Sequence, residues 1–361
     1  MIAAPPPGRD PLGYLAVVSR LCAAGTYEAI LPTHEQAWLF AAGRHLLPAD
    51  APIAVAPAAA FDRVQGKADF AALLDELAIP QPRWWRCDER PETVPYPHWV
   101  KASYGTAGRA VRQVETREQE RQAIRDLSGD GGPVIGQAPA PGRYGQVQAL
   151  FEHGRLVAAH TSVGVGTGAG GSAAARLSVD HPAARDHSAR VGAYLCWHGG
   201  LTLDYFHVDD QPQFIECNPR TVEPANAAQA GVDLPGLTIA LSAGRPLPAQ
   251  PVIGRPGIRT RGALALAIGA AEQHSDRSAV LRVLADCALR RGENGRATEV
   301  LTPLFGDPPS VIPFVVVTSR LLASSRGAIS LSAGAVRAYS VTPATIDVVR
   351  NTDPGSPRLA C

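Results

Sequence analysis

The residues best suited to chemistry lie in one stretch, 201–220. Two runs of alternating apolar and polar side chains flank a polar Asp-Asp-Gln-Pro break, which predicts two strands joined by a turn. In that register Asp204 lies opposite Glu216, and Asn218 shares their face of the hairpin. Two carboxylates and an amide oxygen, with Arg220 just beyond, suit a hard cation that carries phosphates. The alternative is a surface hairpin with solvated acids and an Asn-Pro turn.

The other face of the predicted hairpin is apolar. The same register places Tyr205 opposite Ile215, with Leu201 and Leu203 on the side away from the carboxylates. A strand with one apolar and one polar face covers a core while presenting its polar side chains to a ligand or to solvent.

Composition limits the class of protein. The chain has 361 residues, enough for two or three domains with real cores. A net charge of +1 with 19% charged residues provides no basic surface for nucleic acid. The six cysteines form no C-x-x-C pair, which favours reduced thiols over zinc sites or disulfides. No secretory leader and no apolar run of the ~18 residues that a span requires is evident, so we expect a cytoplasmic protein without a membrane partner.

The first 60 residues combine two kinds of pattern. Residues 12–24 and 34–47 have apolar side chains at helical spacing, whereas 29–32 and 52–57 are short apolar pieces typical of strands. The sequence predicts a small α/β unit over residues 1–60. This unit is abbreviated, because a Pro-rich tail stands where a first strand and its glycine turn would begin.

A second group of candidate residues lies between positions 61 and 137. Lys67 is near the start of a predicted helix, where a solvated lysine is the common explanation. Lys101 ends a predicted strand and precedes the turn 103–108, whose small residues let backbone N–H groups point at phosphate oxygens. Strand, turn, strand, polar helix and strand form a predicted lobe over residues 97–137. A glycine-bearing hairpin turn is by itself more often structural than functional.

One glycine-rich segment could be mistaken for a dinucleotide-binding motif. Residues 166–171 match G-x-G-x-x-G, but no complete βαβ unit surrounds them. We therefore interpret 164–171 as a flexible loop that covers a site or contacts a substrate. The histidines show no H-x-x-x-H spacing, and no G-x-S-x-G nucleophile motif occurs.

Taken in order, these features resemble the ATP-grasp superfamily over residues 60–245. The order is a helix lysine, a strand lysine before a glycine turn, a small lobe, a short linker and an acidic hairpin. The phrase Phe-Ile-Glu-Cys-Asn-Pro-Arg at 214–220 is similar to the E-x-N-P-R signature of carbamoyl phosphate synthetase large chains, biotin carboxylases and carboxylate-amine ligases. The resemblance implies an α/β (α+β) ATP-grasp fold that holds a nucleotide between two lobes.

The resemblance also implies a role for each candidate residue. Magnesium or manganese would be held by Asp204, Glu216 and Asn218, and Arg220 would act with Lys101 on the transferring phosphoryl group. The residues that would bind ATP are Lys67, Lys101, Ser103, Gly105, Thr106, Gly108, Gln137, Ala138 and Ala140. Arg176, Gly170 and Gly171 are candidates for substrate contact.

Two positions depart from the family pattern. Relatives carry an acidic residue after the linker glutamine, but Ala138 stands here, so the adenine or ribose contact has to be made by another group. Relatives also place a basic residue on the strand before the glycine loop. Here residues 161–163 of that strand are Thr-Ser-Val, so Arg176 is the candidate for the role of the missing basic residue.

The main hypothesis is an ATP- and magnesium-dependent ligase that activates a carboxylate as an acyl phosphate and joins it to an amine. One alternative is a bicarbonate-phosphorylating, carboxylase-like or carbamoyl-phosphate-like enzyme. The other is a nucleotide-binding protein without catalysis. The predicted domains are 1–60, an ATP-grasp domain over 61–245, and a mainly helical extension over 246–361 that could contribute to a homodimer interface.

Overall fold

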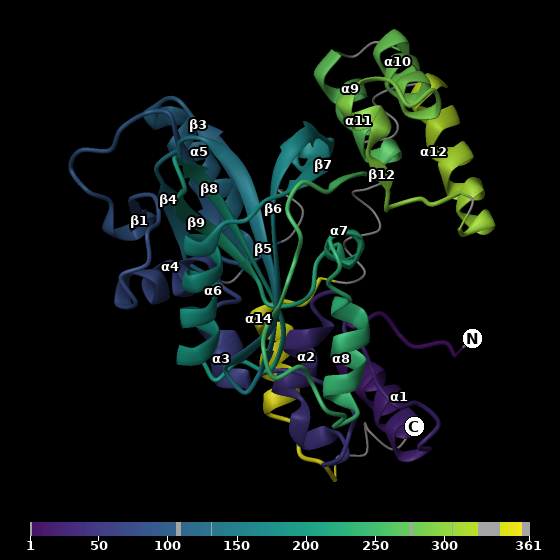
Figure 1. Ribbon diagram of the computed structural model, residues 1–361. Coiled ribbons are helices and arrows are strands. Elements are labelled where there is room, and N and C mark those ends of the chain that lie inside the picture. The colour runs from purple at the N-terminus through teal and green to yellow at the C-terminus, as the bar shows by residue number, and fades with distance from the viewer. Residues whose placement is uncertain are drawn as a thin grey trace.

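The computed structural model describes residues 2–105, 110–130, 132–274, 277–304, 306–323 and 340–355. Helices surround two separate sheets in these segments (Figure 1). The predicted α/β class is confirmed. Short 3-10 helices join the longer elements: η1 (Arg44–Leu46), η2 (Cys87–Glu89), η3 (Ser128–Asp130), η4 (Ala169–Gly171) and η5 (Pro308–Ser310).

The larger sheet forms the body of the molecule. Its strand order is β12-β11-β7-β6-β5-β8-β9, and β10 pairs with β6. Within this order, the neighbouring pairs β7–β6, β6–β5, β5–β8 and β8–β9 are all antiparallel. The bounds are β5 (Arg143–Glu152), β6 (Arg155–Thr167), β7 (Ala173–Ser178), β8 (Gly199–Val208), β9 (Gln211–Asn218), β10 (Val252–Ile253), β11 (Arg259–Arg261) and β12 (Thr298–Glu299).

Alternation along β5 and β8 gives this sheet two different faces. Odd-numbered side chains such as Val147, Leu203 and Tyr205 are fully buried in a core with Ala184 and Val191 of α6 (Pro182–Tyr194). The even-numbered side chains of these strands project to the other side of the sheet. They include the polar residues Gln146, Gln148, Thr202 and Asp204, all of them buried. Part of that side is covered by α7 (Pro224–Gln229) and α8 (Leu234–Ser242).

The β8–β9 hairpin has the predicted carboxylate register, with Asp204 paired to Glu216. Its two-residue turn is Asp209-Asp210, and both residues have positive φ, 47° and 59°, as a type I′ turn requires. The prediction for the apolar face was wrong: Tyr205 pairs with Phe214, not Ile215, because the register shifts between Asp204 and Tyr205. The irregularity lets Phe214 face the core while Glu216 stays beside Asp204.

The smaller sheet is a separate lobe, at the upper left of Figure 1. Its order is β1-β4-β2-β3, with β1 (Trp84–Arg86), β2 (His98–Ala102), β3 (Val111–Val114) and β4 (Val134–Gln137). The helix α5 (Arg117–Leu127) begins at Thr116, whose hydroxyl accepts a hydrogen bond from the Gln119 N–H, and packs on β2 and β3. The helix α4 (Lys67–Glu76) contacts both β4 and β9, so it joins the lobe to the large sheet.

The N-terminal region is helical, with α1 (Pro11–Ala23), α2 (Gln36–Ala42) and α3 (Ala58–Asp62). The short strands predicted at 29–32 and 52–57 are not formed: both segments are irregular, although the Ile30 N–H donates to the Pro52 carbonyl. No neighbouring strand extends this pairing within residues 2–60. Apolar side chains in these segments are instead buried by helices.

The chain beyond residue 245 differs from the predicted arrangement of a separate extension. The strands β10, β11 and β12 add to the large sheet, and α14 (Pro343–Arg350) packs on α1 and α2. Ile346 and Val349 belong to the same buried core as the N-terminal helices. Only α9 (Ala263–His274), α10 (Arg277–Ala288), α11 (Gly292–Arg296) and α12 (Val311–Ala323) form a distinct helical group, at the upper right of Figure 1.

The glycine-rich segment is more ordered than predicted. The strand β6 continues to Thr167 and pairs with β7, so only residues 168–172 form a loop. Gly170 and Gly171 have φ of 58° and 81°, and the Gly170 N–H donates to Glu272 of α9. This loop is therefore attached to the C-terminal helical group.

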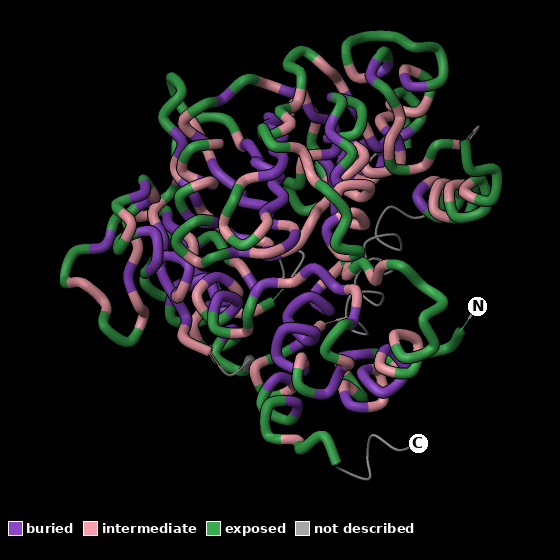
Figure 2. Tube along the Cα trace, turned by 60° about the horizontal axis from the view of Figure 1, so that its bottom comes forward, coloured by how far each residue is buried: buried purple, intermediate pink, exposed green. Residues whose placement is uncertain are grey.

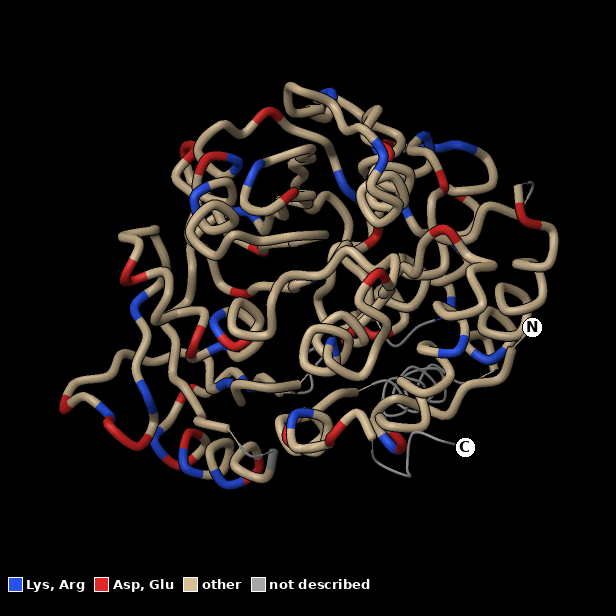
Figure 3. The backbone as a smooth tube through the Cα atoms, turned by 90° about the horizontal axis from the view of Figure 1, so that it is seen from below, with Lys and Arg blue, Asp and Glu red and all other residues tan. Residues whose placement is uncertain are grey.

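Buried positions concentrate in the interior of the body, whereas exposed positions follow the outer loops and helices (Figure 2). Acidic and basic residues are interspersed along the chain (Figure 3), in agreement with the small net charge. Within the described ranges, every helix is too short or too polar to span a bilayer.

Candidate active site

The carboxylates predicted from the hairpin converge in the structure. Asp204 Oδ1 accepts a hydrogen bond of 3.0 Å from Gln146 Nε2, and Asp204 Oδ2 accepts one of 3.2 Å from Asn218 Nδ2. Glu216 lies on the neighbouring strand directly across from Asp204. The three predicted metal ligands therefore occupy one small area of the sheet. Hard-cation ligands of this kind fit Mg²⁺ or Mn²⁺.

Two lysines from other elements approach this acidic area. Lys67, the first residue of α4, places its Nζ 3.0 Å from Glu216 Oε1. Lys101 of β2 is 7% exposed and donates a 2.6 Å hydrogen bond from Nζ to Gln137 Oε1. Both ammonium groups are thus held between the small lobe and the hairpin, where negatively charged phosphates would offset them.

Burial and charge shift the pKa values of these groups. Burial, reinforced by the nearby Glu216, raises the pKa of Asp204 to about 6. Burial also raises the pKa of Glu216, but the attraction of Lys67 and Lys101 outweighs this effect, so the net pKa is lowered. Burial lowers the pKa of Lys101 to about 8. Like charges and desolvated cations in one place are typical of a site completed by a charged ligand.

The predicted phosphate-binding turn is described only in part. The side chain of Ser103 is buried, and its backbone carbonyl accepts from the Lys67 N–H at 3.0 Å. Gly105 has a φ of 130°, and its carbonyl accepts a 3.4 Å hydrogen bond from Lys67 Nζ. The predicted residues Thr106 and Gly108 lie outside the described residues.

Tyr104 in the same turn contacts the N-terminal region. Its ring stacks on that of Trp38 of α2, with centroids 5.7 Å apart and planes 3° from parallel. This contact links the turn of the small lobe to the N-terminal helices.

The predicted adenine segment begins at the end of β4. Gln137 is buried and Ala138 and Ala140 are half-buried. The Ala138 N–H donates to the Arg83 carbonyl at 2.8 Å, so this amide is already engaged. The next residue, Pro139, has no N–H to donate.

Arg220 lies in a loop that polar side chains of the sheet hold in place. Thr202 Oγ1 donates to the Arg220 carbonyl at 2.8 Å, and Gln148 Nε2 donates to the Val222 carbonyl. The loop runs close to β8: a Cβ added at Gly200 would lie 2.3 Å from Thr221 Oγ1. The buried amide and hydroxyl groups of the sheet therefore fix the backbone that carries the guanidinium.

The predicted substrate residues separate in space. Arg176 of β7 is buried, donates from Nε to Glu223 Oε2 at 3.1 Å, and lies 5.7 Å from the centre of the Tyr144 ring. Burial raises the pKa of Asp204, and the positive charge of Arg176 lowers it by a smaller amount. Gly170 and Gly171 instead lie in the loop attached to α9.

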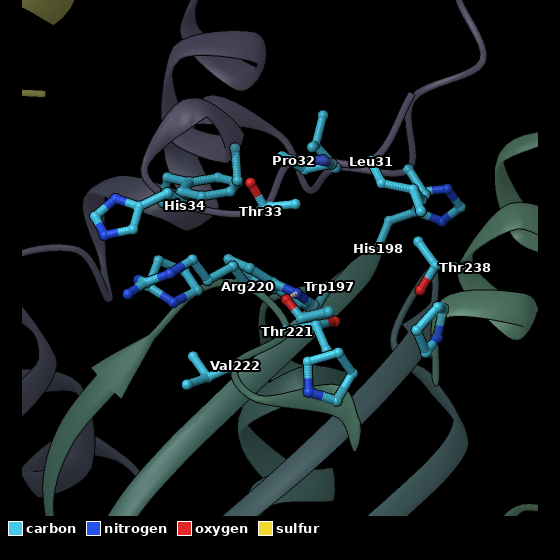
Figure 4. Close-up of a pocket in the computed structure, with 18 of the residues that line it drawn as sticks. Leu31, Pro32, Thr33, His34, Trp197, His198, Arg220, Thr221, Val222 and Thr238 are labelled. Atoms are coloured by element: carbon cyan, nitrogen blue, oxygen red, sulfur yellow. Dashed lines mark hydrogen bonds between the residues drawn. The ribbon is translucent and has the colours of Figure 1, made fainter. Parts of the chain in front are cut away.

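A cavity of about 270 Å³ lies next to Arg220 (Figure 4). Leu31, Pro32 and His34 of the N-terminal region form one wall, and Arg220 and the residues that follow it form the opposite wall. Trp197, His198 and Thr238 lie at the base and far end of this pocket. The remaining lining residues are Thr33, Ala37, Ala54, Val55, Phe61, Gly200, Pro219, Thr221, Val222, Glu223, Pro224 and Pro235.

The N-terminal region contributes a buried carboxylate near Arg220 that no sequence pattern indicates. Glu35 is 5% exposed, and its Oε2 accepts a 2.6 Å hydrogen bond from the Val341 N–H. Burial raises the pKa of Glu35, while Val341, Arg220 and Lys67 oppose the shift. No spacing in the sequence connects residue 35 with residue 220, so only the tertiary structure could reveal this proximity.

Comparisons with known proteins place this geometry in context. No protein-family profile matches the chain. Acetyl-CoA carboxylase 1 of Arabidopsis thaliana is 28% identical over 185 residues, covering 45% of this chain and 8% of the relative. Multifunctional protein ura1 of Schizosaccharomyces pombe is 22% identical over 214 residues, covering 54% and 10%. The chain thus spans a tenth or less of the length of these two curated relatives.

Solved structures share the fold at low identity. Biotin carboxylase from Campylobacter jejuni has a TM-score of 0.53 and 17% identity, covering 67% of this chain and 61% of its own. L-amino acid ligase from Bacillus licheniformis has a TM-score of 0.51 and 16% identity, covering 66% and 62%. The biotin carboxylase domain dimer of Hydrogenobacter thermophilus 2-oxoglutarate carboxylase, solved with MgADP and bicarbonate, has a TM-score of 0.53 and 17% identity, covering 68% and 61%. These proteins have the ATP-grasp fold, and the chain has the same fold.

Proposed function

We propose that the chain is an ATP- and Mg²⁺-dependent ligase that activates a substrate carboxylate for attack by an amine. One observation carries the proposal. Lys67 of α4 and Lys101 of β2 lie close to the acidic face of the β8–β9 hairpin, which has Asp204, Glu216 and Asn218. Phosphoryl transfer needs positioned positive charge more than covalent help from the protein. Two lysines facing two carboxylates and an amide supply this arrangement.

The lysines and the turn of the small lobe would bind the phosphates. Lys67 and Lys101 would neutralise phosphate oxygens, and the turn 103–108 would cover them with backbone N–H groups. The segment 137–140 would contact the adenine. Lys67 would then exchange its 3.0 Å contact with Glu216 for contacts to the nucleotide.

Asp204, Glu216 and Asn218 would hold the metal. The Asn218 amide nitrogen already donates to Asp204, which leaves the Asn218 oxygen directed to another partner. A bound Mg²⁺ or Mn²⁺ would offset the negative charge that develops on the phosphate oxygens during phosphoryl transfer. The raised pKa of Asp204 agrees with a carboxylate that is stabilised by a cation ligand.

The proposed reaction has two steps. A carboxylate oxygen attacks the γ-phosphorus, the bond from that phosphorus to the β–γ bridging oxygen breaks, and ADP leaves. The amine nitrogen then attacks the acyl carbon, phosphate leaves and the nitrogen loses a proton. The guanidinium of Arg220, whose backbone is fixed by Thr202, would contact the oxygens of the transferring group.

The names of the similar proteins support this proposal at a coarse level. They describe carboxylases and a ligase, two of them with a β,γ-ATP or MgADP ligand. The proposal for this chain extends to a cytoplasmic enzyme that acts on small molecules. Because one similar structure is a domain dimer, a homodimer is proposed as well.

The function is tested by ADP release with Mg²⁺ and pooled organic acids, in the presence of hydroxylamine. Hydroxylamine converts an acyl phosphate to a hydroxamate, which is coloured with iron. We expect hydroxamate and ADP in equal amounts. ATP binding without ADP release under any condition would contradict an enzyme and favour the non-catalytic nucleotide-binding protein.

Phosphorylation of bicarbonate is the rival activity, favoured by the 28% identity to an acetyl-CoA carboxylase. The same assay separates the two, because bicarbonate yields no stable hydroxamate. ADP release that depends on bicarbonate and is indifferent to organic acids would replace the ligase with a carboxylase-like enzyme.

A further inference from the structure

The cavity beside Arg220 has two charged lining residues, Arg220 and Glu223, together with polar threonines and histidines and an apolar part. Its apolar lining comes from both the N-terminal region and the large sheet, and includes Leu31, Val55, Phe61 and Trp197. Trp197 and Phe61 are buried, with ring centroids 4.9 Å apart, and the indole N–H of Trp197 donates to the Gly200 carbonyl. These two rings therefore form a fixed, almost fully buried layer behind the pocket.

Arg220 is the cation of the pocket. Among the described residues, no hydrogen bond or ion pair is formed by its guanidinium, although its backbone is held by Asn218 and Thr202. Arg220 lies in the pocket lining, in the loop that follows β9. A desolvated guanidinium without a paired carboxylate is a receptor for an anion, because its planar N–H donors match carboxylate geometry.

The other polar groups of the pocket restrict what the anion can carry. The carboxylate of Glu223 lies at the lining and already pairs with Arg176. His34 faces Arg220 across the cavity, and its pKa is lowered by burial and by Arg220 (Figure 4). A neutral imidazole and a carboxylate offer no site for a second negative charge on the ligand.

From this pocket we infer the substrate class: a small monocarboxylic acid with an apolar chain, whose carboxylate meets Arg220 and whose carbon chain lies along the apolar lining at Leu31 and Val55. This inference rests on the proposed function, since the carboxylate at Arg220 is the group that ATP would phosphorylate. A volume of about 270 Å³ is just below the usual range of about 300–1,000 Å³ for ligand pockets, which suits a small acid. Bicarbonate would leave the apolar part of the pocket unused.

The test is calorimetric binding of acetate, butanoate, hexanoate and adipate to the full chain with MgADP. Transfer of a methylene group from water to an apolar site raises affinity about fourfold, so hexanoate should bind far more tightly than acetate. Adipate, with the length of hexanoate and a second carboxylate, should bind at least tenfold more weakly than hexanoate. Equal affinity for all four acids, or preference for adipate, would overturn the inference.

A filled pocket gives the second arm of the test. Val55→Trp should reduce hexanoate affinity at least tenfold and leave acetate and ADP affinity within twofold. Val315→Trp is the matched control, because Val315 lies on α12 and is 53% exposed. An unchanged hexanoate affinity in Val55→Trp would place the acid elsewhere and overturn the inference.

ADP release in the same acid series separates this inference from the proposed function. Tight hexanoate binding without ADP release from any acid would contradict the ligase and leave the pocket assignment standing. Release that is fastest with acetate or adipate would support the ligase and overturn the apolar substrate class.

Discussion

Lys67 Nζ lies 3.0 Å from Glu216 Oε1, so the first turn of α4 is joined to the β8–β9 hairpin by an ion pair. Lys67 is the first residue of α4, where the positive end of the helix dipole disfavours a lysine, so Glu216 is its compensating partner. Glu216 keeps 35% of its side chain exposed, so the pair is accessible to a ligand. A nucleotide with its metal could therefore insert between the two charges.

Glu216→Gln tests the metal ligand directly. We expect ADP release to fall at least about 100-fold, since a neutral amide is a poor ligand for a hard cation and no longer attracts Lys67. The thermal midpoint should change little, because partly exposed ion pairs contribute about 1 kcal/mol or less. Glu118→Gln, at a position 70% exposed on α5, is the control. Full activity in the Glu216 variant would exclude the hairpin from the mechanism.

Lys101→Met tests the buried ammonium. The variant should bind ATP at least about tenfold more weakly in a calorimetric titration, because one phosphate partner is lost. Its free energy of unfolding should stay within about 2 kcal/mol of the parent, since removal of a buried charge offsets the unpaired Gln137 oxygen. Arg121→Met on the exposed side of α5 should change neither quantity. Unaltered ATP affinity in Lys101→Met would remove Lys101 from the nucleotide site.

Stability at acid pH should depend on His160. Burial, with a smaller contribution from Arg176, lowers the pKa of this histidine from 6.5 to about 4. Its ring nitrogens lie 2.7 Å from Gln148 Oε1 and 2.7 Å from Ser178 Oγ. Because the folded pKa is below the unfolded one, its stabilisation is complete above pH 6.5 and declines as pH falls toward 4.

The measurement is urea unfolding of the parent and of His160→Gln at pH 7.5 and pH 4. Between pH 7.5 and pH 4, the free energy of unfolding of the parent should fall by about 3 kcal/mol more than that of the variant, because unfolding is linked to the uptake of one proton by His160. His274→Gln, at an exposed position, should behave as the parent does. Identical pH dependence in parent and His160→Gln would mean that the pKa of His160 is the same in the folded and unfolded states.

Because α14 packs on the N-terminal helices, truncation of one buried side chain in α14 should lower the free energy of unfolding substantially. Ile346 is 1% exposed in the shared core, so Ile346→Ala should lower the free energy of unfolding by about 2–5 kcal/mol. Val348 lies on the same helix at 47% exposure, and Val348→Ala should cost less than about 0.5 kcal/mol. Equal, small effects in urea unfolding would show that α14 is not part of this core.

Local patterns predicted the parts of the fold that depend on neighbouring residues. The hairpin itself, with a polar turn between two alternating strands, follows from local patterns. The two-residue turn alone pairs Tyr205 with Phe214 and would pair Asp204 with Ile215. The register shift between Asp204 and Tyr205, which alternation does not encode, places Glu216 opposite Asp204 while Phe214 stays in the core. Likewise, the glycines at 164 and 166 resemble a loop in sequence but belong to β6, where they pair with Arg176 and Ala175 of β7.

Proximity across long stretches of sequence could not be predicted. Residues 29–32 look like a strand because they are apolar, yet the strand needs a partner that no sequence pattern locates. The pocket combines residues from 31 to 238, and the Glu35 carboxylate contacts residue 341. Such contacts are decided by the packing of complete elements rather than by periodicity.

The bond from the Val341 N–H to Glu35 joins residues 306 positions apart, and it has a consequence for synthesis. Ribosomes add roughly 5–20 residues per second, so α1 and α2 emerge roughly 15 to 60 s before α14 does. During that interval the first helices lack the apolar side chains of Ile346 and Val349 that cover them. The core that the N-terminal helices share with α14 therefore closes only after residue 349 has been translated, and until then part of its apolar surface is uncovered.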